Sequence, residues 1–169
     1  MTNCVGLSLS ATVSAGGATL SRSRGGTVEA AHGGISTSFV DHELDDMDEL
    51  FVRCHPSWLL AIGEHSHTLL SWTPDDPEIR DLPPIARLDL PGYDPGGLHR
   101  IGFFDVDEAS CLVESEVGFC LVHRKKGLLW EDVHDDQTRR VTSVSNGVIR
   151  TDSENGSDIY SLTDGSYVR

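Results

Sequence analysis

The sequence predicts an all-β fold made of antiparallel sheets in repeated four-strand units, with one short helix near residues 42–52. Three observations favour this fold class. From residue 57 onward the apolar stretches are short and turn residues separate them, as is typical of strands. Helical spacing of apolar residues occurs in one segment. A constant spacing of 38 residues relates the C-terminal stretches to one another.

The chain of 169 residues fits one domain, 1–169, large enough to bury roughly 70% of the surface of its unfolded form. Residues 1–40 are rich in glycine and contain three glycine pairs. Short stretches of alternating apolar and small polar residues lie between the pairs, which favours narrow strands joined by glycine turns. A flexible Gly/Ser/Ala leader is the alternative. The pairs are Gly16-Gly17, Gly25-Gly26 and Gly33-Gly34.

The charge is strongly negative, with a net value of −14. Residues 1–40 hold Arg22 and Arg24 against Glu29, so 11 basic and 26 acidic side chains remain in 41–169. Nucleic acid and anionic lipid both bind through Lys and Arg, so we expect neither as a partner. The apolar runs are far shorter than the ~20 residues of a membrane span. Residues 1–20 lack the basic start of a secretory signal, and we therefore expect a cytoplasmic protein.

The segment "DHELDDMDELFV", residues 41–52, is the predicted helix. Leu44, Met47, Leu50 and Phe51 fall close to one helical face, and early acidic residues suit the positive end of a helix dipole. Pro56 ends the segment. The opposite face is either solvated or a docking surface for a basic partner, and its residues are Asp45, Asp46, Asp48 and Glu49.

Two dipeptides predict tight hairpins in the C-terminal part of the chain. Asn146-Gly147 and Asp164-Gly165 suit a type I′ turn, which needs positive φ at both central residues. Further turn sequences, "KKG" and "SENGSD", separate other apolar stretches.

The 38-residue spacing places the apolar and turn positions of 103–130 on those of 141–168. A weaker copy lies 52 residues earlier, and the 14 extra residues correspond to the proline-rich insert 73–97. The matched pairs are Val106 with Val144, Cys111 with Ile149, Gly118 with Gly156, Leu121 with Ile159 and Gly127 with Gly165.

"SCLVESEVGFCLVHRKKGLLWE" followed by "VTSVSNGVIRTDSENGSDIYSLTDGSYV" resembles consecutive blades of a β-propeller of the quinoprotein-like or WD-repeat kind. The resemblance covers residues 101–169, and more loosely 57–169, although the Gly-His and Trp-Asp dipeptides of WD repeats are absent. It implies four-stranded units around an axis. A closed ring needs at least four of them, so residues 1–40 would form the first. An open two-sheet sandwich fits the same strand pattern.

The stretch "GEHSHTLLSW" contains an HxH motif, which on a strand places both imidazoles on one face, as two ligands of one metal require. With His99, it resembles the metal motifs of cupins. The resemblance implies His65, His67 and His99 as ligands of a divalent transition metal. The glutamate of the cupin motif is replaced by Ser71, which removes one ligand. The alternative is that the two histidines lie on the exposed face of an edge strand.

Catalytic motifs are absent from the sequence: it has no G-x-S-x-G, no phosphate-binding loop and no HExxH. The four cysteines have no zinc-site spacing and are expected to be buried and reduced. The pair Glu114 and Glu116 would share one strand face, as in two-carboxylate sites, although most such pairs are solvated. The three tryptophans, Trp58, Trp72 and Trp130, are expected to pack in the core.

We therefore predict a non-catalytic, acidic interaction module that needs no cofactor and binds another protein, in particular a basic one. A specific form of this hypothesis is an immunity or antitoxin-like protein that neutralises a basic toxin. The alternative from another class is a small cupin-like metal-dependent enzyme or metal-binding β-sandwich. A third is that the chain is one part of a larger propeller assembly.

Overall fold

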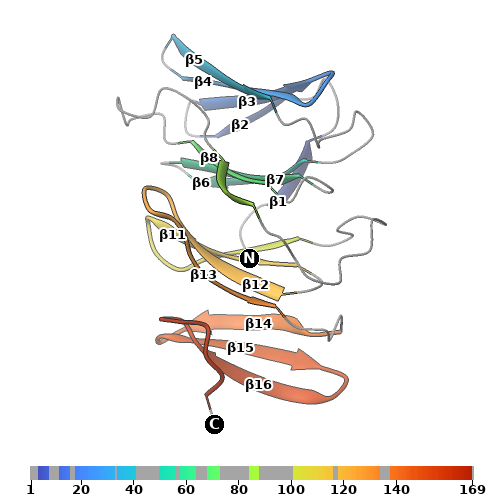
Figure 1. Cartoon of the computed structure of the whole chain (residues 1–169), viewed down its shortest axis with the longest axis vertical. Coiled ribbons are helices and arrows are strands. Elements are labelled where there is room, and N and C mark those ends of the chain that lie inside the picture. The colour runs from blue at the N-terminus through green and yellow to red at the C-terminus, as the bar shows by residue number, and fades with distance from the viewer. Residues whose placement is uncertain are drawn as a thin grey trace. The chain divides into compact units, whose positions relative to one another are not determined.

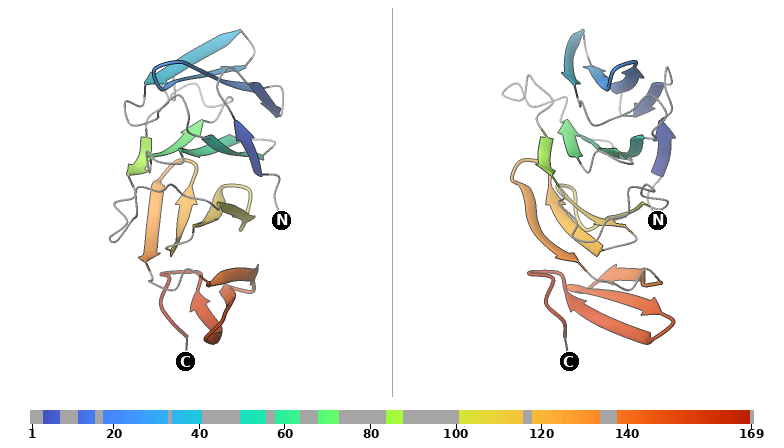
Figure 2. Two further views of the ribbon diagram at one scale, coloured as in Figure 1. Left: turned by 90° about the vertical axis from the view of Figure 1, so that its right-hand side faces the viewer. Right: turned by 45° about the vertical axis from the view of Figure 1, so that its right-hand side comes forward.

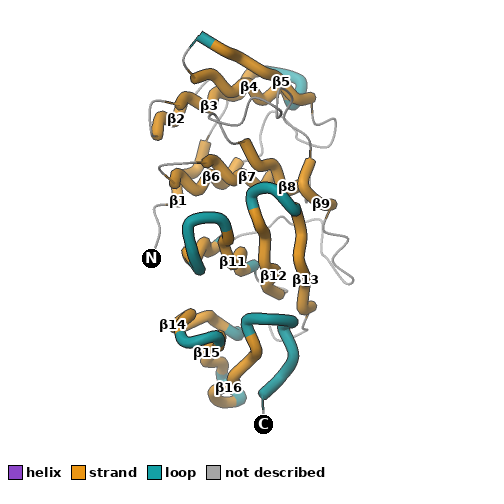
Figure 3. Tube along the Cα trace, turned by 90° about the vertical axis from the view of Figure 1, so that its left-hand side faces the viewer, coloured by secondary structure: helices purple, strands orange, loops and turns teal. Residues whose placement is uncertain are grey.

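The computed structural model describes residues 4–7, 12–15, 18–32, 34–40, 50–55, 58–63, 68–72, 84–87, 101–115, 118–133 and 138–168. Sixteen strands and no helix lie within these residues (Figure 3). All strand pairs among them are antiparallel. The prediction of an all-β protein with antiparallel sheets is therefore confirmed. None of the described residues belongs to a helix able to span a membrane.

Two compact units divide the chain, Thr2–Asp89 and Leu90–Arg169. The first unit contains two open sheets, with strand orders β2-β3-β4-β5 and β1-β6-β7-β8-β9 (Figure 1). The strands are β1 Cys4–Leu7, β2 Thr12–Ala15, β3 Ala18–Ser23, β4 Thr27–His32, β5 Ile35–Val40, β6 Leu50–His55, β7 Trp58–Gly63, β8 Thr68–Trp72 and β9 Pro84–Arg87.

Turns that contain glycine connect β3 to β4 and β4 to β5, in the part of the chain for which the sequence leaves strands with glycine turns and a flexible leader as alternatives. Gly25 and Gly26, between β3 and β4, have φ of 73° and 71°, and Gly34, before β5, has φ of 82°. These left-handed conformations suit glycine because it has no Cβ. Two arginines of the unit, Arg22 on β3 and Arg53 on β6, are buried.

The predicted helix near 42–52 is wrong where the structure describes it, since Leu50, Phe51 and Val52 lie in β6. This strand pairs with β1 on one side and β7 on the other, and Val52 is fully buried. Hydrogen bonding to two neighbouring strands outweighs a short stretch of helical apolar spacing, because helix propensity is a weak preference that tertiary context overrides. Residues 42–49 lie outside the described residues.

The second unit contains two further open sheets, which Figure 2 shows as successive layers. One has the order β10-β11-β12-β13 and the other β14-β15-β16. The strands are β10 Gly102–Asp105, β11 Ser110–Glu114, β12 Gly118–His123, β13 Gly127–Val133, β14 Arg140–Ser145, β15 Val148–Ser153 and β16 Gly156–Ser161.

The two predicted hairpin turns have different outcomes. Asn146 and Gly147 have φ of 53° and 76°, so both central residues have the positive φ expected of a type I′ turn between β14 and β15. At the second site only Gly165 has positive φ, 73°. The Ser161 N–H donates to the Ser166 carbonyl at 2.7 Å, so a four-residue loop returns the chain along β16. The two-residue hairpin prediction is wrong there.

The predicted 38-residue spacing coincides with the strand bounds of the second unit. Shifted by 38 residues, β12 falls on β16, and β10 and β11 fall within β14 and β15. The fourth position holds β13 in one sheet. In the other it holds a short segment that makes a single bridge, Tyr160 to Tyr167.

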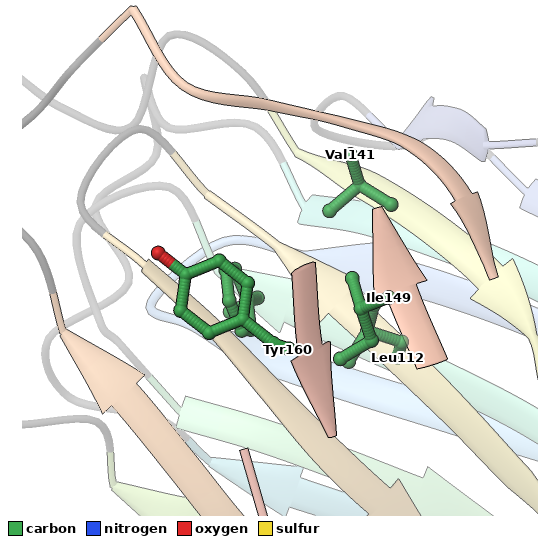
Figure 4. Packing of buried hydrophobic residues seen from close by; sticks show 5 residues of the cluster. Leu112, Val141, Ile149 and Tyr160 are labelled. Atoms are coloured by element: carbon green, nitrogen blue, oxygen red, sulfur yellow. The ribbon is translucent and has the colours of Figure 1, made fainter. Parts of the chain in front are cut away.

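The core of this unit lies between its two sheets (Figure 4). Leu112 and Phe119 from one sheet pack with Val141, Ile149 and Tyr160 from the other, and all five are buried. The Phe119 ring meets the Tyr160 ring edge to face, with centroids 5.0 Å apart. Partly buried residues complete the cluster, namely Phe104, Val106, Trp130, Val144 and Leu162.

Candidate functional site

The residues predicted to bind a metal or a partner from sequence lie outside the described residues. This applies to His65, His67 and His99 of the metal hypothesis. It applies equally to Asp45, Asp46, Asp48 and Glu49 of the docking hypothesis. Among the described residues, no group of three or more His, Cys, Asp or Glu side chains is placed to hold a metal ion. The polar groups that the structure does bring together lie in the second unit.

Glu114, at the end of β11, forms a hydrogen bond between the two sheets of that unit. Its Oε1 accepts the Val141 N–H of β14 at 2.7 Å, and the side chain is 6% exposed. A Cβ on Gly102, the residue opposite on β10, would lie 2.8 Å from Glu114 Oε2, so the glycine makes room for the carboxyl group. The expectation that this glutamate belongs to a solvated pair is wrong for Glu114. Glu116 lies outside the described residues.

Burial changes the acidity of Glu114. Loss of hydration raises its pKa from 4.5 to about 7, and the hydrogen bond from Val141 opposes this only in part. A carboxyl group with this pKa exchanges its proton near neutral pH. The carboxyl group is nevertheless buried, so a substrate in solution has little access to it.

A second cluster of polar side chains lies around Tyr160 on β16. Arg139 donates to the Tyr160 hydroxyl at 2.5 Å and forms an ion pair with Asp158 at 2.9 Å. Its guanidinium carbon also lies 5.6 Å from the centroid of the Tyr160 ring. Burial raises the pKa of Tyr160, and the positive charge of Arg139 opposes that rise. The phenol therefore stays protonated and acts as a hydrogen-bonding group rather than as a base.

Trp130 of β13 fixes the chain that follows β16. Its Nε1–H donates to the Leu162 carbonyl at 3.0 Å. A Cβ on Gly165 would lie 2.8 Å from the indole ring, so the backbone passes directly over the tryptophan. The packing predicted for Trp130 is thus present, whereas the side chains of Trp58 and Trp72 are not described.

Tyr167 and Val168 follow this loop and expose apolar surface. They are 56% and 42% exposed. The Tyr167 ring nevertheless packs on Tyr160, with centroids 5.8 Å apart, and the Val168 N–H donates to the Ile159 carbonyl at 2.8 Å. Asp164, fully exposed beside them, accepts hydrogen bonds from Ser166 that lower its pKa. We name Asp164, Tyr167 and Val168 the exposed C-terminal surface.

Two of the four cysteines can be placed. Cys111 and Cys120 are buried and form no disulfide, as expected, and burial raises the pKa of the Cys120 thiol. A protonated buried thiol is a poor nucleophile. Both side chains lie among the buried core residues of the second unit.

Sequence reasoning did not single out Arg139, Tyr160 or Tyr167. Arg139 and Tyr160 are 21 residues apart and meet through the pairing of three strands. The available signal was the 38-residue spacing, which places Tyr160 at the position of the apolar Val122, so a buried ring is expected there.

Comparison with known proteins yields no family. No protein-family model and no curated protein sequence matches the chain. One solved structure with a similar backbone is described as "Crystal structure of the computationally designed Ika8 protein: crystal packing No.1 in P63". Its TM-score is 0.43 at 9% sequence identity, and the match covers 96% of this chain and 60% of that one. The chain thus spans about 60% of the length of the designed protein.

Proposed function

We propose that the chain is a non-catalytic interaction module that binds another protein through the exposed C-terminal surface. The observation that carries this proposal is that Tyr167 is 56% exposed although its ring and backbone are held in place. A tyrosine fixed before binding loses little side-chain entropy when a partner covers it. Tyrosine is also among the residues that contribute most to protein interfaces.

The charge of the chain indicates the kind of partner. A net charge of −14 favours the approach of a basic protein and disfavours nucleic acid. The acidic residues predicted from sequence, Asp45, Asp46, Asp48 and Glu49, belong to this proposal as a second contact region. In its specific form the partner is a basic toxin enzyme that this chain neutralises as an immunity or antitoxin-like protein in the cytoplasm.

The test is affinity capture from the native host, with wild-type chain and two variants compared. We expect Tyr167→Ala to lose the captured protein and Leu129→Ala to retain it, since Leu129 of β13 is also exposed, at 43%, but lies outside the surface. Higher salt should weaken capture if charge contributes. Equal recovery by both variants, or no partner at low salt, contradicts the proposal. Inhibition of a captured basic enzyme at one-to-one stoichiometry tests the immunity form.

We also propose that the two sheets of the second unit are successive units of one repeat, stacked as propeller blades are, rather than the two halves of a sandwich. The support comes from which face of each sheet contacts the other sheet. The β10–β13 sheet contributes Leu112 and the β14–β16 sheet contributes Ile149, yet under the 38-residue shift Ile149 corresponds to Cys111. Non-equivalent faces in contact indicate head-to-tail stacking. Solution mass and small-angle scattering test whether the chain stays single or assembles into a larger array.

The metal-dependent alternative remains a prediction based on His65, His67 and His99. Its test is the metal content of purified protein. Stoichiometric Zn, Fe, Mn or Ni that is lost in His67→Ala would support it, and metal-free protein would contradict it.

A further inference from the structure

The exposed C-terminal surface lies at the end of a row of aromatic rings that begins in the core of the second unit. The Phe119 ring packs on Tyr160, and Tyr160 packs on Tyr167, with centroids 5.0 and 5.8 Å apart. The exposed fraction rises along this row, from 3% at Phe119 to 6% at Tyr160 and 56% at Tyr167. Of these three rings, Tyr167 is therefore the ring that a second molecule can cover.

Tyr160, the middle ring of the row, has a cation beside it. The guanidinium carbon of Arg139 lies 5.6 Å from the centroid of the Tyr160 ring, and Arg139 forms an ion pair with Asp158 at 2.9 Å. This combination suits a guanidinium, because the ring face attracts the cation and the carboxylate accepts its N–H groups. The fold thus already binds one arginine between a tyrosine and an aspartate that is close to it in sequence.

Tyr167 also has an aspartate close to it in sequence, Asp164. Asp164 Oδ1 accepts hydrogen bonds from the Ser166 hydroxyl at 2.7 Å and from the Ser166 N–H at 3.1 Å. These bonds place the carboxylate against the residue that precedes Tyr167, and they lower the pKa of Asp164. The side chain is exposed, so its negative charge is accessible to a partner.

The backbone that carries Asp164 and Tyr167 is held by hydrogen bonds to β16. The Ser161 N–H donates to the Ser166 carbonyl at 2.7 Å. The Val168 N–H donates to the Ile159 carbonyl at 2.8 Å. The carboxylate and the ring are therefore positioned before a partner arrives, so that binding costs little conformational entropy on this side of the interface.

We propose that the exposed C-terminal surface recognises an arginine of the partner, whose guanidinium packs on the Tyr167 ring and pairs with the Asp164 carboxylate. This inference rests on the proposed function and names the chemical group that the surface selects. The net charge of −14 favours a basic partner of either kind, lysine-rich or arginine-rich. Arginine is favoured over lysine because its planar guanidinium stacks on an aromatic ring and directs N–H groups at a carboxylate.

The test is NMR titration of the full chain with a peptide of alternating glycine and arginine, and with the same peptide carrying lysine or neutral citrulline instead of arginine. The arginine peptide should give the largest shifts at the Tyr167 ring and the Ser166 amide, and the citrulline peptide the smallest. Tyr167→Leu should weaken binding of the arginine peptide by about two- to five-fold, whereas Tyr167→Phe keeps the ring and should retain it. Asp164→Asn should weaken it by about two-fold and reduce its dependence on salt.

The matched control is Asp107→Asn. Asp107, between β10 and β11, is also exposed, and its Oδ1 likewise accepts a nearby backbone N–H, from Ala109 at 2.7 Å. Its substitution removes the same charge and should leave binding at Tyr167 unchanged.

Three results would overturn the arginine site: no shift at Tyr167, equal affinity for the arginine and lysine peptides, or equal losses in Asp107→Asn and Asp164→Asn. Capture from the native host separates this failure from failure of the proposed function. A partner that Tyr167→Ala loses and Asp164→Asn retains in full contradicts the arginine site alone. A partner that Tyr167→Ala retains contradicts the proposed function itself.

Discussion

The β10–β13 and β14–β16 sheets have strands at equivalent positions but differ in which faces are covered. All five residues of β11 are buried, as are the first five of β12, so side chains on both faces of these strands have little exposure. In β15 the buried residues Ile149 and Thr151 alternate with exposed Arg150 and Asp152. The comparison teaches that strand position follows from turns and spacing, whereas the residue on each face decides whether a further layer can pack there.

The largest expected difference in stability is between two alanine substitutions at equivalent positions of the two sheets. Leu112 is fully buried in the core, and Leu112→Ala should lower the free energy of unfolding by about 2–5 kcal/mol because it leaves a cavity. The equivalent position, 38 residues later, holds the exposed Arg150. Arg150→Ala should change the free energy of unfolding by less than about 0.5 kcal/mol. Urea unfolding of both variants measures the difference. Similar losses would show that the outer face of the β14–β16 sheet is covered too.

A second large effect is expected at Gly165, where the chain passes over Trp130. Gly165→Ala must accept a φ of 73° and a Cβ 2.8 Å from the indole ring. We expect a loss of about 2–4 kcal/mol, from left-handed strain together with overpacking. Gly147→Ala is the control, because Gly147 has φ of 76° with no atom within 4 Å of the added Cβ. It should lose only about 1–2 kcal/mol. Equal losses of stability in the two variants would show that contact with Trp130 does not contribute to the effect of Gly165→Ala.

Part of this architecture could be predicted from the sequence because it depends on local chemistry. Asn146-Gly147 encodes its own turn, and glycines at a constant spacing mark where strands begin. The helix prediction failed at Leu50–Val52 because pairing with β1 and β7 is a non-local effect. The burial of Glu114 could not be predicted either, since a glutamate at a strand end looks solvated until the facing sheet supplies the Val141 N–H.

A moderate effect is expected at Trp130, whose equivalent is Val168. Trp130→Phe keeps an aromatic ring against Phe119 but removes the Nε1–H that donates to the Leu162 carbonyl. The loss should be about 1–2 kcal/mol, because a part-buried carbonyl loses its donor. Val168→Ala, at a position 42% exposed, should cost less than about 0.5 kcal/mol. Thermal unfolding compares the two, and a larger loss in Val168→Ala would contradict the assignment of Trp130 as the residue that fixes this segment.

The smallest effect is expected at the ion pair that borders the core on the solvent side. Asp158→Asn removes the charge that pairs with Arg139 at 2.9 Å, but the two side chains are 25% and 17% exposed, so solvent screens the interaction. We expect a loss of about 0.5–1 kcal/mol that shrinks as salt is added. Arg139 keeps its hydrogen bond to Tyr160, which limits the damage. Glu154→Gln, at an exposed turn position, should show no loss. A loss above about 2 kcal/mol that does not change with salt would contradict this, because it would mean that the Arg139–Asp158 ion pair is shielded from solvent as a buried pair is.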